Sequence, residues 1–338
     1  MSEPNGLAAG AGDAPVECRD MKIDLLGAAG PRGWPEPGCR CASCGRLRAS
    51  GDTRRPTLVL VDGVPLEECS RREVPGGYDV RAPGGERILY ASGAGTAPEP
   101  APGARYDAAL LDLVGRPDHL GRLRNSGAVT SATEVLAVHV DHRIASPAEL
   151  DRRLGWWLRP RRGPYRSLLL GGARSGKSRE AELRLAAHPD VTYVATARVD
   201  DADPEWSARI AAHRERRPSW WRTAETADVA DVLRGASGAV LVDGLGTWLT
   251  AAMDACGGWD TPDAMPDAIG PRIDELVDTW RTTEACVVAV SDEVGLSLVP
   301  TSQAGRIFRD LLGRLNQRLA AESEETALVV AGRTLDLS

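Results

Sequence analysis

The chain has 338 residues, of which 48 are acidic and 41 basic, so its formal net charge is −7. This length favours two domains, each able to bury a full core. The acidic balance argues against nucleic acid or an anionic membrane as partner, which leaves small molecules as the expected ligands. Without an 18-residue apolar run or a signal-peptide pattern, we expect a cytoplasmic protein with no membrane span.

The first half of the chain predicts a β-rich domain after a disordered start. Residues 1–20 are rich in Gly, Ala and acids, which is typical of disorder. An apolar run from Lys22 leads into a glycine loop ending at Gly30. Gly- and Pro-rich segments then separate four further β-type runs at 57–61, 87–91, 108–111 and 135–140. A helix is expected from Ser146 to about Trp157, because Ser-Pro-Ala-Glu resembles a capping box with Pro at its first position.

Three of the seven cysteines lie within six residues, as Cys39, Cys41 and Cys44. In a cytosolic chain this cluster indicates metal binding rather than disulfides. A tetrahedral zinc site needs a fourth ligand, and His142 is a reasonable candidate. Three reduced cysteines in an ordinary loop are the alternative.

From Tyr165 onward strands and helices alternate, which predicts an α/β domain with a parallel sheet. The break before it, residues 159–164, reads Arg-Pro-Arg-Arg-Gly-Pro and is expected to be a linker between domains 21–158 and 165–338. Strands are expected at 167–170, 191–195, 239–242, 286–290 and 327–330. Helices are expected near 179–187, 206–216, 226–233, 273–281 and 303–321.

The strand that begins this second domain leads directly into a phosphate-binding motif. Its eight residues fit Gly-x-x-x-x-Gly-Lys-Ser and are Gly171, Gly172, Ala173, Arg174, Ser175, Gly176, Lys177 and Ser178. In such a loop backbone N–H groups and the helix N-terminus face the phosphates, the lysine reaches the outer phosphates, and the serine hydroxyl holds Mg²⁺. A chance glycine-rich turn is the alternative, but the flanking strand and helix favour the phosphate loop.

Two further residues are candidates for chemistry. Asp243 ends an apolar strand, where a phosphate-loop fold places the carboxylate that supports Mg²⁺, although an Asp can also begin an ordinary turn. His213 lies among several arginines, and a neutral imidazole can attack phosphorus. From spacing alone, a solvated basic helix face with an incidental His is the better interpretation of that segment.

Six motifs in consistent order over about 165–338 resemble the bifunctional adenosylcobinamide kinase / adenosylcobinamide-phosphate guanylyltransferase family of cobalamin biosynthesis. They are Gly-Gly-Ala-Arg-Ser-Gly-Lys-Ser at 171–178, Tyr-Val-Ala-Thr-Ala at 193–197, Arg-Ile-Ala-Ala-His-Arg-x-x-Arg-Pro at 209–218, Trp-Arg-Thr-Ala-Glu at 221–225, Glu-Val-Gly-x-x-x-Val-Pro at 293–300 and the segment 306–317. The resemblance implies that His213 becomes guanylylated, and that members of the family form homo-trimers.

The same resemblance implies further nucleotide-site residues. They are Ala195, Thr196, Ala197, Arg214, Arg217, Glu225 and Asp243. Two positions depart from the family pattern, since Asp292 replaces the usual Asn and Ser297 the usual Gly, and both concern the loop after one strand.

Residues from Met21 to about Trp157 resemble, less strongly, a metallo-β-lactamase-fold domain of the phosphodiesterase type. The resemblance implies that the cysteines and a late His form a structural zinc site. The string His-x-His-x-Asp-His of that group's catalytic metal site is missing, so we expect a degenerate, non-hydrolytic domain. Asp112 and His139 are either remnants of the old site or, more simply, satisfied polar residues at strand ends.

These observations predict an enzyme that uses Mg²⁺ with ATP or GTP, phosphorylates adenosylcobinamide, and then transfers GMP to adenosylcobinamide phosphate through His213. The catalytic residues are expected to be His213 and Lys177, with Ser178 and Asp243 toward Mg²⁺. A nucleotide-binding regulator without turnover and a P-loop small-molecule kinase are the alternatives, and labelling of the protein by GTP would separate them from the bifunctional enzyme.

Overall fold

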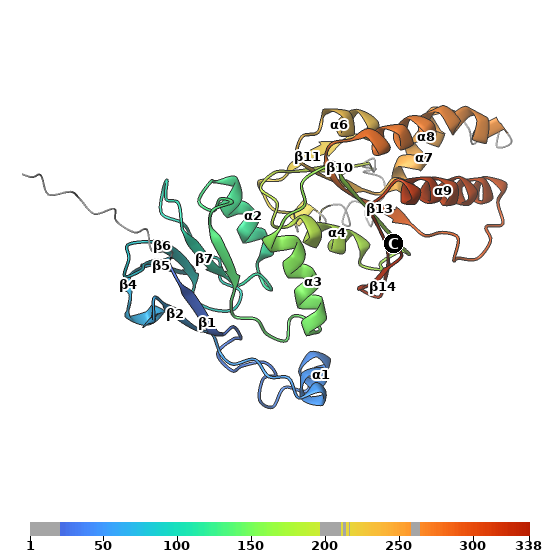
Figure 1. Cartoon of the computed structure of the whole chain (residues 1–338). Coiled ribbons are helices and arrows are strands. Elements are labelled where there is room, and N and C mark those ends of the chain that lie inside the picture. Colours follow the sequence, from blue (N-terminus) through green and yellow to red (C-terminus); the bar gives the residue numbers. More distant parts are fainter. Residues whose placement is uncertain (1–20, 197–210, 212–213, 216, 258–263) are drawn as a thin grey trace, which may run out of the picture.

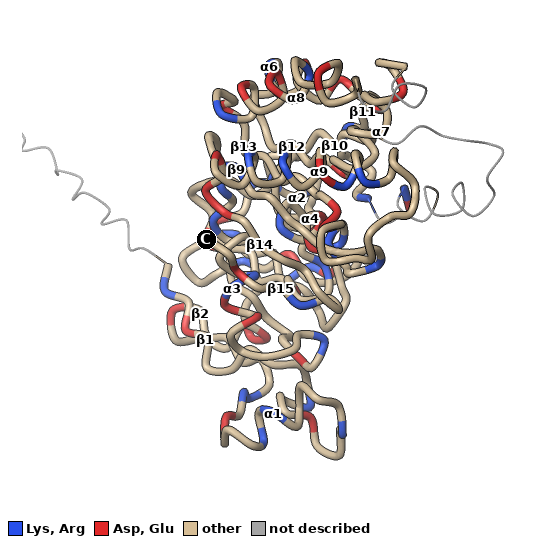
Figure 2. The backbone as a smooth tube through the Cα atoms, turned by 90° about the vertical axis from the view of Figure 1, so that its right-hand side faces the viewer, with Lys and Arg blue, Asp and Glu red and all other residues tan. Residues whose placement is uncertain are grey.

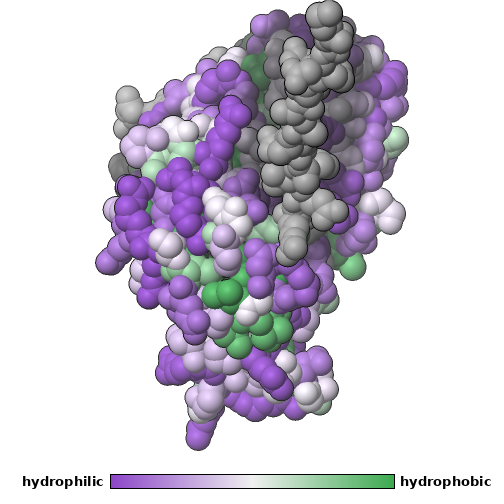
Figure 3. All heavy atoms as spheres, turned by 60° about the vertical axis from the view of Figure 1, so that its left-hand side comes forward, coloured by the Kyte–Doolittle hydropathy of each residue, from purple (hydrophilic) through white to green (hydrophobic). Residues whose placement is uncertain are grey.

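The structure is a computed structural model that describes residues 21–196, 211, 214–215, 217–257 and 264–338. Figure 1 shows two halves side by side, with the β-rich N-terminal part on the left and the C-terminal α/β part on the right. Within the described residues, no helix combines the length and the apolar character needed to cross a membrane. Figure 3 shows a face that is mostly hydrophilic, with hydrophobic residues gathered in its lower half.

The N-terminal half contains two small sheets. The first is antiparallel, in the order β1 (Ile23–Gly27), β2 (Leu58–Val61), β3 (Val64–Pro65). The second runs in the order β4 (Ser70–Val74), β5 (Gly77–Arg81), β6 (Arg87–Ala91), β7 (Ala108–Leu111), β8 (Glu134–Ala137). Its first three strands are antiparallel and its last three parallel. Every residue of β7 is buried, so this strand forms the centre of the N-terminal core.

The described part of the N-terminal half also contains three α-helices and one short 3₁₀ helix. They are α1 (Ala42–Ser50), the short 3₁₀ helix Leu66–Glu68, α2 (Pro117–Asn125) and α3 (Pro147–Leu158). Two of the α-helices, α2 and α3, reach the second half. The predicted cap of α3 is confirmed, because the Ser146 hydroxyl accepts a hydrogen bond from the Glu149 N–H at 3.2 Å. The strands 87–91 and 108–111 also form as predicted.

The C-terminal half is built on one seven-stranded sheet, which confirms the predicted α/β class. Its order is β11 (Arg222–Glu225), β10 (Val191–Ala195), β12 (Ala239–Asp243), β13 (Cys286–Asp292), β9 (Tyr165–Gly171), β14 (Glu325–Val330), β15 (Arg333–Asp336). All neighbouring strands are parallel except β14 and β15. The inner strands are almost completely buried, as continuous apolar runs predict for a sheet covered on both faces.

Helices lie on both faces of this sheet (Figure 1). They are α4 (Lys177–Leu185), α6 (Val229–Gly235), α7 (Leu245–Ala255), α8 (Met265–Thr282) and α9 (Gln303–Ala321). The predicted start at Thr226 is wrong, because the Asp228 carboxylate accepts from the Asp231 N–H and caps α6. The predicted helix 273–281 is only the end of α8, and 206–216 lies mostly outside the described residues.

The two halves share a core at their junction, where α2, α3 and α4 meet. Trp157 of α3 and Ala187, just after α4, belong to one buried cluster with α2. The half-buried Arg124 side chain donates to the carbonyls of Trp157 at 2.7 Å and of Ala187 at 2.8 Å. A Cβ on Gly121 would lie only 2.4 Å from the Ala186 carbonyl oxygen, so glycine is what allows α2 to approach this closely.

Candidate nucleotide and metal sites

The phosphate-binding loop lies between the inner strand β9 and the helix α4. Gly176 has φ +98° and forms the N-cap of α4, a conformation that glycine adopts without strain. A Cβ on Gly171 would lie 2.6 Å from the Val329 carbonyl oxygen, so this position also needs glycine. The Ser175 hydroxyl is buried without a hydrogen-bond partner in the described structure. A phosphate oxygen in the loop would satisfy that hydroxyl, as it would the free N–H groups of the α4 N-terminus.

The loop lysine is already engaged inside this site. Lys177 is buried and its Nζ donates to the Gly172 carbonyl at 3.1 Å. The same Nζ lies 2.8 Å from an oxygen of Asp292, at the end of the adjacent strand β13. The Asn316 side chain donates to the Asp292 carbonyl at 3.1 Å, which fixes the end of β13. Asp292, one of the two positions that depart from the pattern of the resembled family, is therefore in direct contact with the phosphate loop.

Asp243 lies at the carboxyl end of β12 and faces the loop serine. Its Oδ1 accepts from the Ser178 hydroxyl at 2.9 Å, and its Oδ2 accepts from the Tyr193 hydroxyl. Burial, and after it the nearby Asp243 carboxylate, raise the pKa of Tyr193, so the phenol stays a donor at neutral pH. A serine hydroxyl next to a carboxylate is the oxygen donor set that Mg²⁺ prefers.

Several of the other predicted nucleotide-site residues lie at the same edge in the described part of the chain, because parallel strands end there together. Ala195 pairs in register with Asp243 on one side and Glu225 on the other. The Thr196 hydroxyl donates to the Gly244 carbonyl at 2.6 Å. The Glu225 carboxylate accepts from Arg214, beside a cavity of about 220 Å³.

Three further predicted residues are Arg217, Ala197 and His213. The guanidinium of Arg217 stacks over the Tyr193 ring, 3.4 Å from its centroid. Ala197 and His213 lie outside the described residues. The roles of all these residues stay predictions.

Sequence reasoning assigned no role to Tyr193 or Thr247, although the structure places both in the site. Tyr193 begins the motif Tyr-Val-Ala-Thr-Ala at 193–197. Its hydroxyl contacts Asp243 only because the strands β10 and β12 are neighbours in the sheet. The Thr247 hydroxyl donates to the Gly244 carbonyl at 2.8 Å, and a Cβ on Gly244 (φ +111°) would lie 2.3 Å from that hydroxyl. The only sequence signal for Thr247 was its place just after Asp243.

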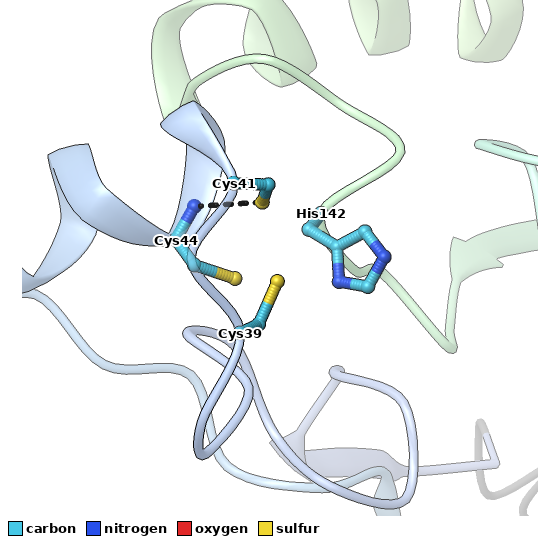
Figure 4. Close-up of side chains that lie close together, drawn as sticks. All are labelled: Cys39, Cys41, Cys44 and His142. Carbon is cyan, nitrogen blue, oxygen red and sulfur yellow. Dashed lines mark hydrogen bonds between the residues drawn. The ribbon is translucent and has the colours of Figure 1, made fainter.

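The predicted cysteine cluster also assembles. One ligand atom from each of Cys39, Cys41, Cys44 and His142 lies within 4.8 Å of the others. Figure 4 shows the sulfurs and the imidazole close together, contributed by α1, by the segment just before it and by the loop before α3. The buried Nδ1 atom of His142 lies 3.4 Å from a Glu36 oxygen but makes no hydrogen bond in the described structure, which leaves it available to a metal. Thiolates and imidazole are the donors of structural zinc sites.

This cluster shapes the local backbone. The Cys41 sulfur accepts from the Cys44 N–H at 3.4 Å and caps α1. That hydrogen bond lowers the pKa of Cys41, which favours the thiolate, whereas burial raises the pKa of Cys44 to about 11. A cation among these sulfurs would favour the thiolate form of both.

The two proposed remnants of a hydrolytic site are satisfied polar residues. The buried Asp112 carboxylate accepts from both terminal nitrogens of Arg143, at 2.8 and 3.0 Å, and from the Gly115 N–H at 3.1 Å. His139 Nε2 lies 2.8 Å from the Ala91 carbonyl oxygen. The Asp112 carboxylate is therefore paired with a guanidinium and a backbone N–H, as expected for a satisfied polar residue, and the non-hydrolytic character of the domain stays a prediction.

The C-terminal half has a mostly parallel sheet, a Gly-x-x-x-x-Gly-Lys-Ser loop between an inner strand and a helix, and an acid at the end of a nearby strand. These features together define a P-loop nucleotide-binding protein. Residues 167–337 match the family described as cobinamide kinase / cobinamide phosphate guanyltransferase. The chain belongs to this family, and its C-terminal half is that of a bifunctional kinase and guanylyltransferase of cobalamin biosynthesis.

Curated relatives agree with this assignment. The bifunctional adenosylcobalamin biosynthesis protein CobU of Salmonella typhimurium strain LT2 is 42% identical over 174 residues, which are 49% of this chain and 95% of the relative. The Escherichia coli K12 protein of the same name is 41% identical over 174 residues, with the same coverage. The Pseudomonas aeruginosa protein CobP is 40% identical over 178 residues, which are 51% of this chain and 96% of the relative.

Among solved structures, an ATPase domain is 14% identical and covers 50% of this chain and 70% of its own. Its TM-score of 0.29 is too low for any comparison of architecture.

Proposed function

We propose that the C-terminal half phosphorylates the hydroxyl of adenosylcobinamide with ATP or GTP, and then transfers GMP from GTP to that phosphate. The observation that carries the kinase step is the convergence of Lys177, Ser178 and Asp243 at the carboxyl ends of β9 and β12. Phosphoryl transfer depends on positioning and charge neutralisation more than on covalent help.

Each of these three residues has a role in that step. Lys177, released from Asp292, would hold the outer phosphates. Ser178 and Asp243 supply the hard oxygen atoms that suit Mg²⁺. Bound there with the nucleotide, Mg²⁺ would neutralise phosphate charge.

The guanylyl step uses His213 as the nucleophile. One imidazole nitrogen attacks the α-phosphorus of GTP, a P–N bond forms, and pyrophosphate leaves. The substrate phosphate oxygen then attacks the same phosphorus, the P–N bond breaks, and the free imidazole returns. Arg214 follows His213 in the chain and donates a hydrogen bond to Glu225 at the edge of the sheet. This contact supports a role for the segment in the nucleotide site.

Labelled GTP tests the proposal. Wild-type protein is incubated with GTP that carries one label in the α-phosphate and another in the guanosine, and is then denatured. It should retain both labels in a form that is labile in acid and stable in base. His213→Asn keeps similar bulk without a nucleophilic nitrogen, so it should retain none and form no GDP-cobinamide, while its kinase activity persists. An adduct of the same stability on His213→Asn would contradict the nucleophile role. A wild type that turns over ATP but never carries label would indicate a kinase only.

We also propose a structural zinc ion at Cys39, Cys41, Cys44 and His142. The geometry and the His142 Nδ1 atom without a hydrogen bond support it.

The proposed domains are a degenerate metallo-β-lactamase-like domain at 21–158 and the P-loop domain at 165–338, joined by a linker at 159–164. In the structure α3 ends at Leu158 and β9 begins at Tyr165.

The family resemblance supports a cytoplasmic homo-trimer. Light scattering of the purified full chain tests its subunit number.

A further inference from the structure

A cavity of about 310 Å³ lies between the two halves of the chain. One wall is α2 with its N-cap, and the other is formed by Glu215 and the segment from Arg217 to Trp220. This volume is at the lower end of the range for small-molecule sites, about 300–1,000 Å³. The second wall follows His213 in the sequence by only a few residues.

Three polar atoms in residues that line this cavity are buried without a hydrogen-bond partner in the described structure. They are Nε2 of His119, Nε of Arg217 and Nε1 of Trp220. Buried polar groups are almost always paired, and each one left unpaired costs free energy. The three unpaired atoms come from both walls of the cavity, so the polar groups at this junction are not all satisfied within the described structure.

Two of the three atoms, Arg217 Nε and Trp220 Nε1, can only donate a hydrogen bond. Burial lowers the pKa of His119 to about 4, so its ring is neutral at pH 7 and adds no positive charge to the cavity.

The charges favour an anion. Arg116, Arg122 and Arg217 line the cavity against two acids, Asp118 and Glu215. Asp118 is already paired with Arg116 through two hydrogen bonds of 3.1 and 3.0 Å. Arg122 is exposed and makes no ion pair with any described residue. Guanidinium groups bind phosphate oxygens through charge-assisted hydrogen bonds.

We propose that α2 and the Arg217–Trp220 segment together bind a phosphate ester between the two halves. Arg217 connects this site to the phosphate loop, because it stacks on Tyr193, whose hydroxyl donates to Asp243. The N-terminal half thereby supplies residues to the neighbourhood of guanylyl transfer. The identity of the ester rests on the proposed function, since GMP and cobinamide phosphate both carry a phosphate and additional hydrogen-bond donors.

Binding measurements on the full chain test the proposal. Lys177→Ala serves as the background, so that the phosphate loop contributes little, and GMP and cobinamide phosphate are titrated separately by calorimetry. Adding Arg122→Glu should weaken at least one of them by about tenfold or more, because a charge-assisted contact becomes a repulsion. Arg55→Glu makes the same charge change at an exposed position that does not line the cavity, and it should leave both affinities unchanged.

The two ligands distinguish the source of the phosphate. Weakening of GMP alone assigns the site to the nucleotide, and weakening of cobinamide phosphate alone assigns it to the substrate. If Arg122→Glu changes neither affinity, or if Lys177→Ala abolishes all binding, the interdomain site is rejected. The proposed function fails separately, through the absence of GTP-derived label on the wild-type protein.

Discussion

Asp292, at the end of β13, forms an ion pair with Lys177 of the phosphate loop. The 2.8 Å ion pair holds the lysine against β13 and places a carboxylate beside the space for phosphates. A nucleotide must therefore displace Asp292 from Lys177 and tolerate its negative charge. The usual Asn at this position would impose neither condition.

We predict that Asp292→Asn strengthens nucleotide binding. Removing one negative charge near the phosphates should lower the Kd for GTP by about three- to tenfold, since charges a few ångströms apart at a protein surface interact by roughly 1–4 kcal/mol before screening. Calorimetry at two salt concentrations measures the effect, which should shrink at high salt. Asp310→Asn, an exposed acid on α9, is the control. Weaker binding in Asp292→Asn would instead show that the carboxylate helps to hold the nucleotide.

Lys177→Ala tests the loop itself. Lys177 is buried beside the Gly172 carbonyl, in position to carry charge to the outer phosphates. Its removal should reduce kinase turnover by about two to three orders of magnitude, as for other lost groups that stabilise transition-state charge. Circular dichroism should show an unchanged fold. Wild-type-like turnover would refute the assignment.

At the scale of elements, sequence predicted best where a motif or a buried strand fixes the local structure. The phosphate loop and the strands Val191–Ala195 and Ala108–Leu111 form where expected, because continuous apolar runs have few other uses. The edge strand Arg222–Glu225 was missed, since it is polar, mostly exposed and extended only through pairing with β10. α2 was missed as well, because its few apolar residues are buried by tertiary contact rather than by a regular pattern.

We expect the stability of the helix α1 to depend on the proposed zinc ion. It has nine residues and begins at the Cys41 cap, and such a short helix is marginal on its own. The purified protein should contain close to one zinc per chain. Cys41→Ser should release it and lower the melting temperature, because a structural site contributes its binding energy to folding.

Elemental analysis and thermal unfolding measure both effects. Cys256→Ser, at the C-cap of α7 and outside the cluster, should keep its zinc. A wild type without zinc would reject the site, and two or more zinc ions would argue for a retained hydrolytic centre.

At the scale of the molecule, the junction binds the two halves into one structure. Arg124 connects α2 to a carbonyl in the last turn of α3 and to one just after α4, and Arg152 of α3 pairs with Glu180 of α4 at 2.7 Å. In Figures 1 and 2 α1 lies at the end of the molecule away from α8, while α2 and α3 lie against α4. Sequence could not foresee this junction, because its contacts join residues far apart in the chain, such as Arg124 and Ala187, which are 63 positions apart.

The junction also contains two histidines that make its stability depend on pH. Burial lowers the pKa of His119, on α2, and of His188, after α4, to about 4 for each. In the unfolded chain both would titrate near pH 6.5. Between these values the unfolded state binds more protons than the folded state, so the free energy of unfolding must fall as pH drops.

We therefore predict that acid weakens the protein well above the range in which its carboxylates titrate. From pH 7 to pH 5, each of the two histidines should remove about 1–2 kcal/mol from the free energy of unfolding. Urea unfolding at the two pH values measures this loss. His188→Asn, which cannot take up the proton, should remove about half of the pH dependence, whatever its effect on stability at pH 7. A free energy of unfolding that stays constant between pH 7 and pH 5 would mean that these imidazoles reach solvent, and that the two halves separate more readily than their shared core implies.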